Sequence, residues 1–144
     1  MAQKRSQRMR VVLMLAERKE QEAARQLGEF QRQLTREQAQ LEELQSYRQE
    51  YLNDYSQAQT DLNTLQRERL SSFIFRLADV SEVQQQKLLT LQQQLEVLRQ
   101  QWQQCHHQRK AIADLIERVL RTEDNEAERQ LQKLMDDMTN TRPR

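Results

Sequence analysis

Hydrophobic residues recur every three or four positions through the first part of the chain. Alternate steps of three and four residues visit Leu13, Ala16, Glu20, Ala23, Leu27, Phe30, Leu34, Glu37, Leu41, Leu44, Arg48, Tyr51, Tyr55, Ala58, Leu62 and Leu65. Only Glu20, Glu37 and Arg48 interrupt this stripe. A sustained repeat of about 3.5 residues is typical of a left-handed coiled coil, whose apolar stripe faces a partner helix. The pattern predicts a long α-helix over about 4–58.

A second stripe with the same spacing begins at Leu88. It passes through Leu88, Leu91, Leu95, Leu98, Trp102, Cys105, Arg109, Ile112, Ile116 and Val119, shifts near Leu120 like a stutter, and resumes at Ala127, Leu131, Leu134 and Met138. Two helical stripes on one chain pair most simply with each other, because a tethered partner is always present at high effective concentration. We therefore predict an all-α fold, a single long antiparallel two-helix coiled-coil hairpin over residues 1–144.

The turn of this hairpin has two candidate positions. Residues 53–64 are rich in Asn, Asp, Ser and Thr, which favour turns and helix caps. They indicate a tip at about 59–64, with Thr64 capping a second helix over about 65–138 and a frayed tail at 139–144. The alternative tip is 70–80, where Asp79 and Glu82 have capping-box spacing. We favour the earlier tip, because the apolar residues within 73–80 fit a packed helix better than an exposed loop.

A tip near residue 62 leaves the end of the second helix without a helical partner. These unpaired turns carry Leu131, Leu134, Met135 and Met138, which would form a surface for another protein. The basic segment from Lys4 to Arg10 would also lie near the acidic stretch of residues 123–128. Exposed ion pairs of this kind contribute only about 0–1 kcal/mol each.

Composition agrees with long helices and limits the classes of partner. Hydrophobic residues make up 36% of the 144 residues and charged ones 31%, so the chain cannot build a thick core. Such polarity also suits a disordered chain, but the regular apolar spacing argues against disorder. The 23 basic and 22 acidic residues give a net charge of +1, so no overall field attracts nucleic acid. We expect no nucleic-acid partner.

The sequence also carries signals about its compartment. The apolar run from Val11 to Ala16 is too short for a signal peptide, and no stretch approaches the roughly 18–20 apolar residues of a membrane span. The single Cys105 cannot form an internal disulfide. We expect a protein of the reducing cytoplasm.

Candidate chemistry is sparse along the chain. Cys105, His106 and His107 are adjacent, and neighbours on a helix point about 100° apart, so they cannot surround one metal ion. A two-helix hairpin also lacks a pocket that excludes water around a nucleophile. We expect no metal, no cofactor, no small-molecule ligand and no enzymatic activity.

Charged residues within the two stripes have two interpretations. They either fix the alignment of the helices at a cost in stability or contact a partner directly. These residues are Glu20, Glu37, Arg48 and Arg109. Gly28, inside the first helix, either permits close approach of another backbone or is tolerated on an exposed face.

Aromatic side chains gather near the predicted tip. Tyr47 lies off the first stripe, and Phe73 and Phe75 cannot both face one narrow seam. Exposed aromatic residues supply much contact area and are enriched at the centres of protein interfaces. The predicted binding face is this aromatic region near the tip, with Tyr47, Tyr51, Tyr55, Phe73 and Phe75.

Several short segments carry a resemblance to a known family. They are Met1-Ala2-Gln3, Leu15-Ala16-Glu17, residues 23–29, Leu41 to Leu44 followed by residues 47–51, Phe73-Ile74 with Leu77, and Trp102 before a basic stretch. In this order and spacing the chain resembles the FliJ proteins of the bacterial flagellar type III export apparatus. The resemblance covers most of the chain.

This resemblance implies three kinds of protein partner. A FliJ protein would bind the flagellar export ATPase, entering its hexameric ring as the stalk of a rotary ATPase does. It would also contact the cytoplasmic part of the membrane export gate, at the inner face of the cell membrane, and the export chaperones. Two alternatives remain, the equivalent stalk of a virulence type III secretion system and a structural coiled coil that spaces or dimerises other modules.

The resemblance also assigns residues to these partners. The gate-facing pattern falls on two rows, Gln40, Leu44, Tyr47 and Tyr51 in the first helix and Phe73, Leu77, Val80 and Gln84 in the second. Contact with the ATPase ring is expected at Arg5, Arg8, Leu131, Leu134 and Met138. The chain departs from the family pattern in having Val80 where a smaller residue is usual and in lacking a glycine at the tip.

Overall fold

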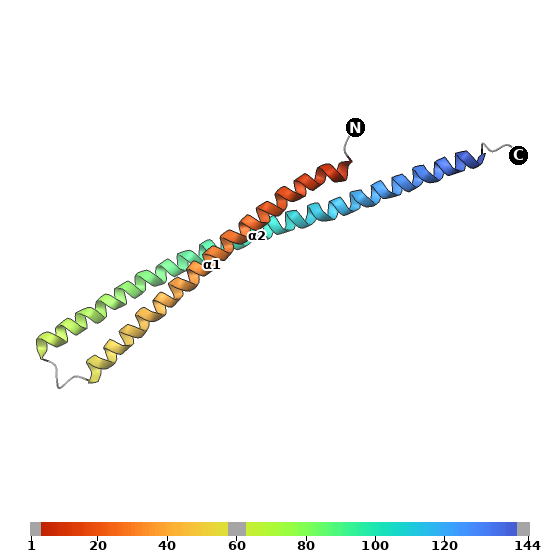
Figure 1. Ribbon diagram of the computed structural model, residues 1–144. Helices are drawn as coiled ribbons and strands as arrows, with labels where there is room; N and C mark the ends of the chain where they lie inside the picture. Colours follow the sequence, from red (N-terminus) through yellow and green to blue (C-terminus); the bar gives the residue numbers. More distant parts are fainter. Residues whose placement is uncertain (1–3, 58–62, 141–144) are drawn as a thin grey trace. The chain divides into compact units, whose positions relative to one another are not determined.

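The computed structural model describes residues 4–57 and 63–140 of the chain. These residues form two α-helices, α1 (Arg5–Gln57) and α2 (Thr64–Asn140), and no strand occurs among them. Figure 1 shows α1 from red to yellow and α2 from green to blue. The predicted all-α class, with two long helices packed against each other, is confirmed. Contacts divide the chain into a hairpin unit, residues 25–100, and a terminal unit, residues 1–24 and 101–144.

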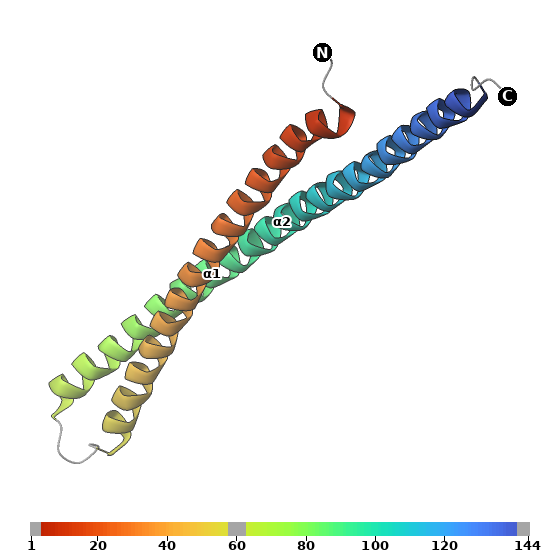
Figure 2. The same cartoon turned by 45° about the vertical axis from the view of Figure 1, so that its right-hand side comes forward.

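In the hairpin unit the end of α1 packs antiparallel to the beginning of α2. Among the described residues of this unit, Ile74, Leu88 and Leu91 are the buried apolar ones, each exposed by 8% or less. Both views show the yellow end of α1 beside the green start of α2 (Figures 1 and 2). Fully burying a large apolar side chain contributes roughly 1.5–3 kcal/mol, so this narrow seam supplies most of the stabilisation of the unit.

The first turn of α2 is capped by Asn63 rather than by Thr64. The backbone N–H of Gln66 donates to Oδ1 of Asn63 at 2.8 Å, and Oε1 of Gln66 accepts from the backbone N–H of Asn63 at 3.3 Å. This reciprocal pair is a capping box. The prediction that Thr64 is the cap was wrong by one residue, because the Asn side chain accepts readily from the first-turn N–H groups.

The alternative turn at 70–80 is not present. Residues 70–80 all lie within α2, and so do Asp79 and Glu82, whose capping-box spacing therefore does not mark a helix start. Of the preferred tip at 59–64, residues 63 and 64 are described and residues 58–62 lie outside the described part. At the other end, Thr139 and Asn140 belong to α2 although the frayed tail was predicted from 139. The Thr139 hydroxyl donates to the Met135 carbonyl at 2.9 Å, and residues 141–144 lie outside the described part.

In the terminal unit the beginning of α1 packs antiparallel to the later part of α2. Ala16 and Ile116 are its buried apolar residues, with relative exposures of 8% and 6%. Contacts between the helices reach Glu123, and every described residue from 124 to 140 is exposed. Within the described part of this unit, the last turns of α2 therefore have no helical partner.

The predicted stripes match the packed faces of both helices closely. Every described residue of the two continuous stripes is buried or half-buried except Arg48 and Leu65. Leu65 is 55% exposed near the start of α2, where few neighbours surround it. Arg48 is exposed because a long basic side chain can carry its charge out of a seam into water.

Candidate protein-binding surfaces

A polar cluster crosses the seam in the middle of the hairpin unit. Gln84 is only 8% exposed, and its amide donates to both the backbone carbonyl, at 3.0 Å, and the carboxylate of Glu37. Lys87 Nζ lies 2.9 Å from the same carboxylate. The Gln84 hydrogen bond, followed by Lys87, lowers the pKa of Glu37. Since these contacts join α1 to α2 at one register, they support the interpretation that Glu37 aligns the helices.

Aromatic residues meet across the seam nearer the tip. The rings of Tyr51 and Phe73 lie edge to face, with centroids 4.9 Å apart and an interplanar angle of 85°. Tyr47, one turn earlier, is 45% exposed, and its hydroxyl donates to Glu43 at 3.0 Å. That hydrogen bond to a carboxylate raises the pKa of Tyr47. Phe73 is 42% exposed, so an aromatic surface remains accessible beside the Tyr51 contact.

The eight residues of the predicted gate-facing rows all lie in the hairpin unit, with different exposures. Gln40, Tyr47, Phe73 and Val80 are exposed, whereas Leu44, Tyr51 and Leu77 are half-buried. Gln84 is buried in the seam, where Glu37 occupies its amide. The accessible part of the rows is thus a mixed aromatic and aliphatic surface.

Phe73 and Phe75 lie on opposite sides of α2, which agrees with the prediction that they cannot both face one narrow seam. Ile74, between them, is buried in the seam. Phe75 is 70% exposed and lines a groove together with Leu52 and Tyr55 of α1. The hairpin unit therefore presents two faces, one with Phe73 and one with Phe75.

A second polar cluster crosses the seam of the terminal unit. Nε of Arg109 lies 2.6 Å from Oε2 of Glu20, and both side chains are partly shielded from water. Nδ1 of His106 lies 3.6 Å from the same oxygen, and the His106 ring stacks on Trp102 with centroids 5.1 Å apart. Arg109 is the main cause that lowers the pKa of Glu20. Two of the four charged stripe residues thus pair with each other.

The beginning of α1 is held by a carboxylate from α2. Glu123 accepts from the Ser6 hydroxyl at 2.7 Å and from the Ser6 backbone N–H at 3.2 Å. The hydroxyl hydrogen bond is the main cause that lowers the pKa of Glu123, and Lys4 adds a smaller contribution. An acceptor is favourable here because the first N–H groups of a helix lack partners and carry partial positive charge. The predicted proximity of the basic start and the acidic stretch is thus realised at Glu123.

The predicted ATPase-facing residues all lie on the surface of the terminal unit. Arg5 and Arg8 are exposed in the first turns of α1. Leu131, Leu134 and Met138 are 60%, 59% and 62% exposed in the last turns of α2, beyond the Glu123 contact. Monomeric proteins rarely expose a row of large apolar side chains unless another molecule covers it.

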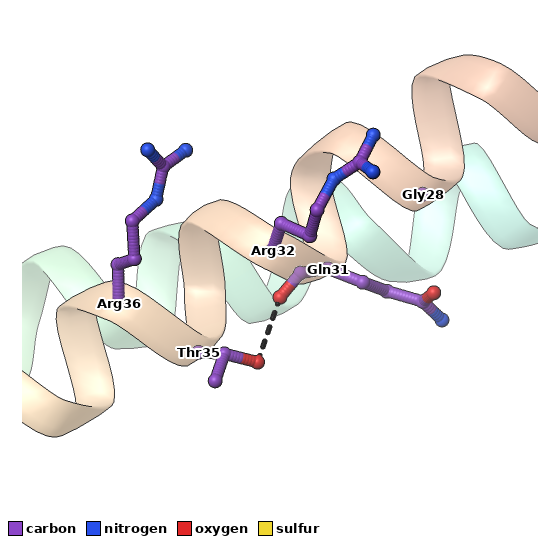
Figure 3. A pocket seen from close by; sticks show the side chains of 5 residues that line it. All are labelled: Gly28, Gln31, Arg32, Thr35 and Arg36. Atoms are coloured by element: carbon purple, nitrogen blue, oxygen red, sulfur yellow. Dashed lines mark hydrogen bonds between the residues drawn. The ribbon is translucent and has the colours of Figure 1, made fainter.

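A shallow hollow of about 600 Å³ lies on α1 in the hairpin unit and includes Gly28. Figure 3 shows Arg32 and Arg36 extending away from the helix and Gln31 pointing in another direction. The Thr35 hydroxyl donates to the Gln31 carbonyl at 3.0 Å. Apart from its two chain neighbours and its own helix backbone, no atom of the described chain lies within 4 Å of a Cβ placed on Gly28, so no described neighbour requires a glycine here. The polar groups around this hollow do not converge on a common point.

Other features bear on metal and membrane binding. Among the described residues, no three His, Cys, Asp or Glu side chains lie together as a metal site would require. Cys105 is half-buried in the stripe where the sequence placed it, and its thiol is free. Neither helix of the described chain contains a stretch long and apolar enough to cross a membrane.

Sequence reasoning missed some residues that shape these surfaces. Ser6 and Ser81 are buried although both are polar, and Glu123 was expected only as part of an acidic stretch. The Ser81 hydroxyl donates to the Leu77 carbonyl of its own helix at 2.7 Å, which is why a polar residue is tolerated in the seam. The seven-residue spacing of Ile74, Ser81 and Leu88 would have revealed this position.

Two paired helices with accessible aromatic and aliphatic rows define an all-α protein of the helical-hairpin class. The family described as flagellar FliJ protein matches residues 5–144, nearly the whole chain. The chain therefore belongs to the FliJ family, whose members are non-catalytic components of the flagellar export apparatus. No curated protein and no solved structure matched the chain.

Proposed function

We propose that this protein is the coiled-coil stalk of the flagellar export apparatus, which binds the export ATPase ring and the cytoplasmic part of the membrane export gate. In this proposal the terminal unit engages the ATPase and the hairpin unit engages the gate. Export chaperones would be additional partners. The observation that carries the proposal is the accessible aromatic surface of Tyr47 and Phe73 in the positions that the family resemblance assigns to the gate.

The composition of this surface favours protein binding. Tyr47, Phe73 and Val80 are 45%, 42% and 51% exposed, and they flank the edge-to-face contact of Tyr51 with Phe73. Large, rigid side chains of this kind lose little conformational entropy on binding and are enriched at hot spots. We propose that Gln84 acts indirectly, because its hydrogen bonds to Glu37 hold the two rows in register.

The unpaired turns of α2 support the assignment of the terminal unit to the ATPase. Leu131 and Leu134 continue the apolar spacing of the α2 stripe, yet no helix covers them in this unit. A helix inserted into a ring can bury such a row against the inner wall. The exposed Arg5 and Arg8 would add basic contacts beside it.

Gate binding is tested by comparing Phe73→Ala with Phe75→Ala. Both changes remove an exposed Phe from α2, but only Phe73 lies in the predicted row. We expect Phe73→Ala to weaken binding to the purified cytoplasmic part of the gate about tenfold or more and to impair flagellar export. Phe75→Ala should bind the gate like the parent protein.

Circular dichroism provides the control for folding, since both variants should keep the far-UV helical signal. Normal gate binding and normal export by a helical Phe73→Ala protein would refute the assignment of this surface. A homodimer that buries the rows of Tyr47 and Phe73 would instead indicate a passive coiled-coil spacer.

A further inference from the structure

The two exposed sides of α2 in the hairpin unit carry different charged residues. Ile74, Ser81 and Leu88 lie seven residues apart and are all buried in the seam, with exposures of 8%, 6% and 7%. Residues that directly precede them therefore lie on one side of α2, and residues that directly follow them lie on the other. The preceding residues are Phe73, Val80 and Lys87, and the following residues are Phe75, Glu82 and Leu89.

On α2 the residues nearest to Phe75 in the helix are acidic, whereas those nearest to Phe73 are mostly basic; on α1, Glu43 lies beside Tyr47 on the Phe73 side. Glu68 and Glu82 lie seven residues before and after Phe75, and Asp79 lies one turn after it. Within the described part of the chain, none of these three carboxylates forms an ion pair. On the Phe73 side, the neighbouring charged residues of α2 are Arg69, Arg76 and Lys87.

The Phe75 face, which we define as Phe75, Leu89, Glu68, Asp79 and Glu82, also contains an apolar groove. Leu52, Tyr55, Ser71, Ile74 and Phe75 line an open groove of about 150 Å³. The groove continues toward the start of α2 as a wider depression of about 460 Å³ that reaches Thr64 and Glu68. Such a groove has room for the large apolar side chains of a docked helix.

Two basic residues adjoin this groove without cancelling its charge. Arg67 lines the wider depression and is already engaged in an interaction of its own. Arg48 is exposed on α1, one turn before Leu52. The α2 side of the groove therefore carries more acidic than basic side chains, namely Glu68, Asp79 and Glu82.

We propose that the Phe75 face is a second docking surface, which binds an amphipathic helix of a partner protein whose apolar row is flanked by Lys and Arg. Apolar side chains of that helix enter the groove beside Phe75 and Leu52, and its basic residues meet Glu68 and Glu82. Helix-in-groove docking is a recurrent mode of peptide recognition, and complementary charge selects the partner and its orientation.

The same charges disfavour other occupants. Pairing with the Phe75 face of a second copy would place like charges against each other, which is unfavourable. Nucleic acids and anionic membranes are repelled for the same reason. The proposed gate-binding surface lies on the opposite side of α2. The docking of a basic helix at the Phe75 face can therefore be tested and refuted independently of gate binding.

The proposal is tested with the full-length protein and two synthetic fluorescein-labelled helices. One helix carries Leu at alternating intervals of three and four residues with Lys at the remaining positions, and the other carries Glu in place of Lys. Fluorescence anisotropy measures the affinity of each helix. We expect the Lys helix to bind at least about tenfold more tightly than the Glu helix, because the two differ only in charge complementarity.

Variants then locate the binding site. Phe75→Ala should weaken binding of the Lys helix about tenfold or more, whereas Phe73→Ala should change it less than about twofold. The double variant Glu68→Gln with Glu82→Gln should bind more weakly and lose much of the salt dependence. All three changes are at exposed positions, so the helical signal should persist.

Several results would overturn the proposal. Absence of binding, equal affinity for the two helices, or unchanged affinity in the Phe75→Ala protein would each exclude a basic helix at this face. Sedimentation velocity adds a further test. A dimer of the parent protein that dissociates on Phe75→Ala would assign the face to a second copy of the chain and overturn the proposal as well.

Discussion

Replacement of Leu88 by Ala tests whether the narrow seam stabilises the hairpin unit. Leu88 is 7% exposed, so almost its entire side chain leaves water on folding. Burial of a Leu side chain contributes roughly 1.5–3 kcal/mol, and Leu→Ala changes in well-packed cores cost about 2–5 kcal/mol. In a seam between only two helices water can reach the vacated space. We therefore expect the lower part of this range, a loss of about 2–3 kcal/mol in the free energy of unfolding.

The neighbouring Leu89 provides a matched control. Leu89 is 52% exposed on the same helix, so Leu89→Ala makes the same chemical change and the same change in helix propensity. We expect Leu89→Ala to lower the free energy of unfolding by less than about 1 kcal/mol, because only part of the Leu89 side chain is removed from water on folding. Urea unfolding followed by far-UV circular dichroism measures both values. Equal losses, or a difference smaller than about 0.5 kcal/mol, would refute the stabilising role of the seam.

Two further changes test polar contacts. Asn63→Ala should lower the free energy of unfolding by about 1 kcal/mol through loss of the cap, whereas Thr64→Ala should be nearly neutral; the reverse order in urea unfolding would contradict the capping box. Because the folded-state pKa of Glu20 lies below its ordinary value of 4.5, its contribution to stability is complete above about pH 4.5 and is lost as the pH falls through the lower folded-state value. Glu20→Gln should therefore flatten the pH dependence of the melting temperature on the acid side, and an unchanged profile would show that the Arg109 contact adds no net stability.

The sequence was sufficient to predict the helices and most of their packed faces. Leu13, Leu41 and Ile116 occupy the seam because a 3.5-residue apolar repeat leaves a helix one continuous face to bury. Polar stripe residues were also placed correctly, since Glu20, Glu37 and Arg109 are all shielded from full exposure. Arg48 was the exception, because periodicity cannot show where a long side chain carries its charge.

Pairing across the seam was not predictable from periodicity alone. That Glu20 meets Arg109, or that Glu37 meets Gln84, depends on the length of the connection between the helices. Connections of several different lengths are compatible with the same two apolar stripes. Lengthening or shortening the connection by one residue changes which residues of α1 and α2 lie opposite each other. The choice between Asn63 and Thr64 as the cap has the same origin, because adjacent polar residues compete for the same N–H groups.

The surfaces were predictable in part. One narrow seam cannot bury all of the aromatic side chains near the tip, so some were expected to be exposed. The exposed ones are Tyr47, Phe73 and Phe75. Their division between two faces, which carry different charges on α2, depends on which side of Ile74 each residue of α2 occupies. That division becomes visible only when the buried positions are known.

The central claim of the proposed function is that the terminal unit acts on the export ATPase. It is tested most directly by measuring ATP hydrolysis by the cognate export ATPase, with and without this protein, across ATPase concentrations that span ring assembly. The account predicts stimulation concentrated at low ATPase concentration, where a stalk nucleates the ring, and loss of stimulation when the exposed Leu131 and Leu134 are both replaced by Ala. No stimulation at any ratio by a folded, helical protein would contradict the account.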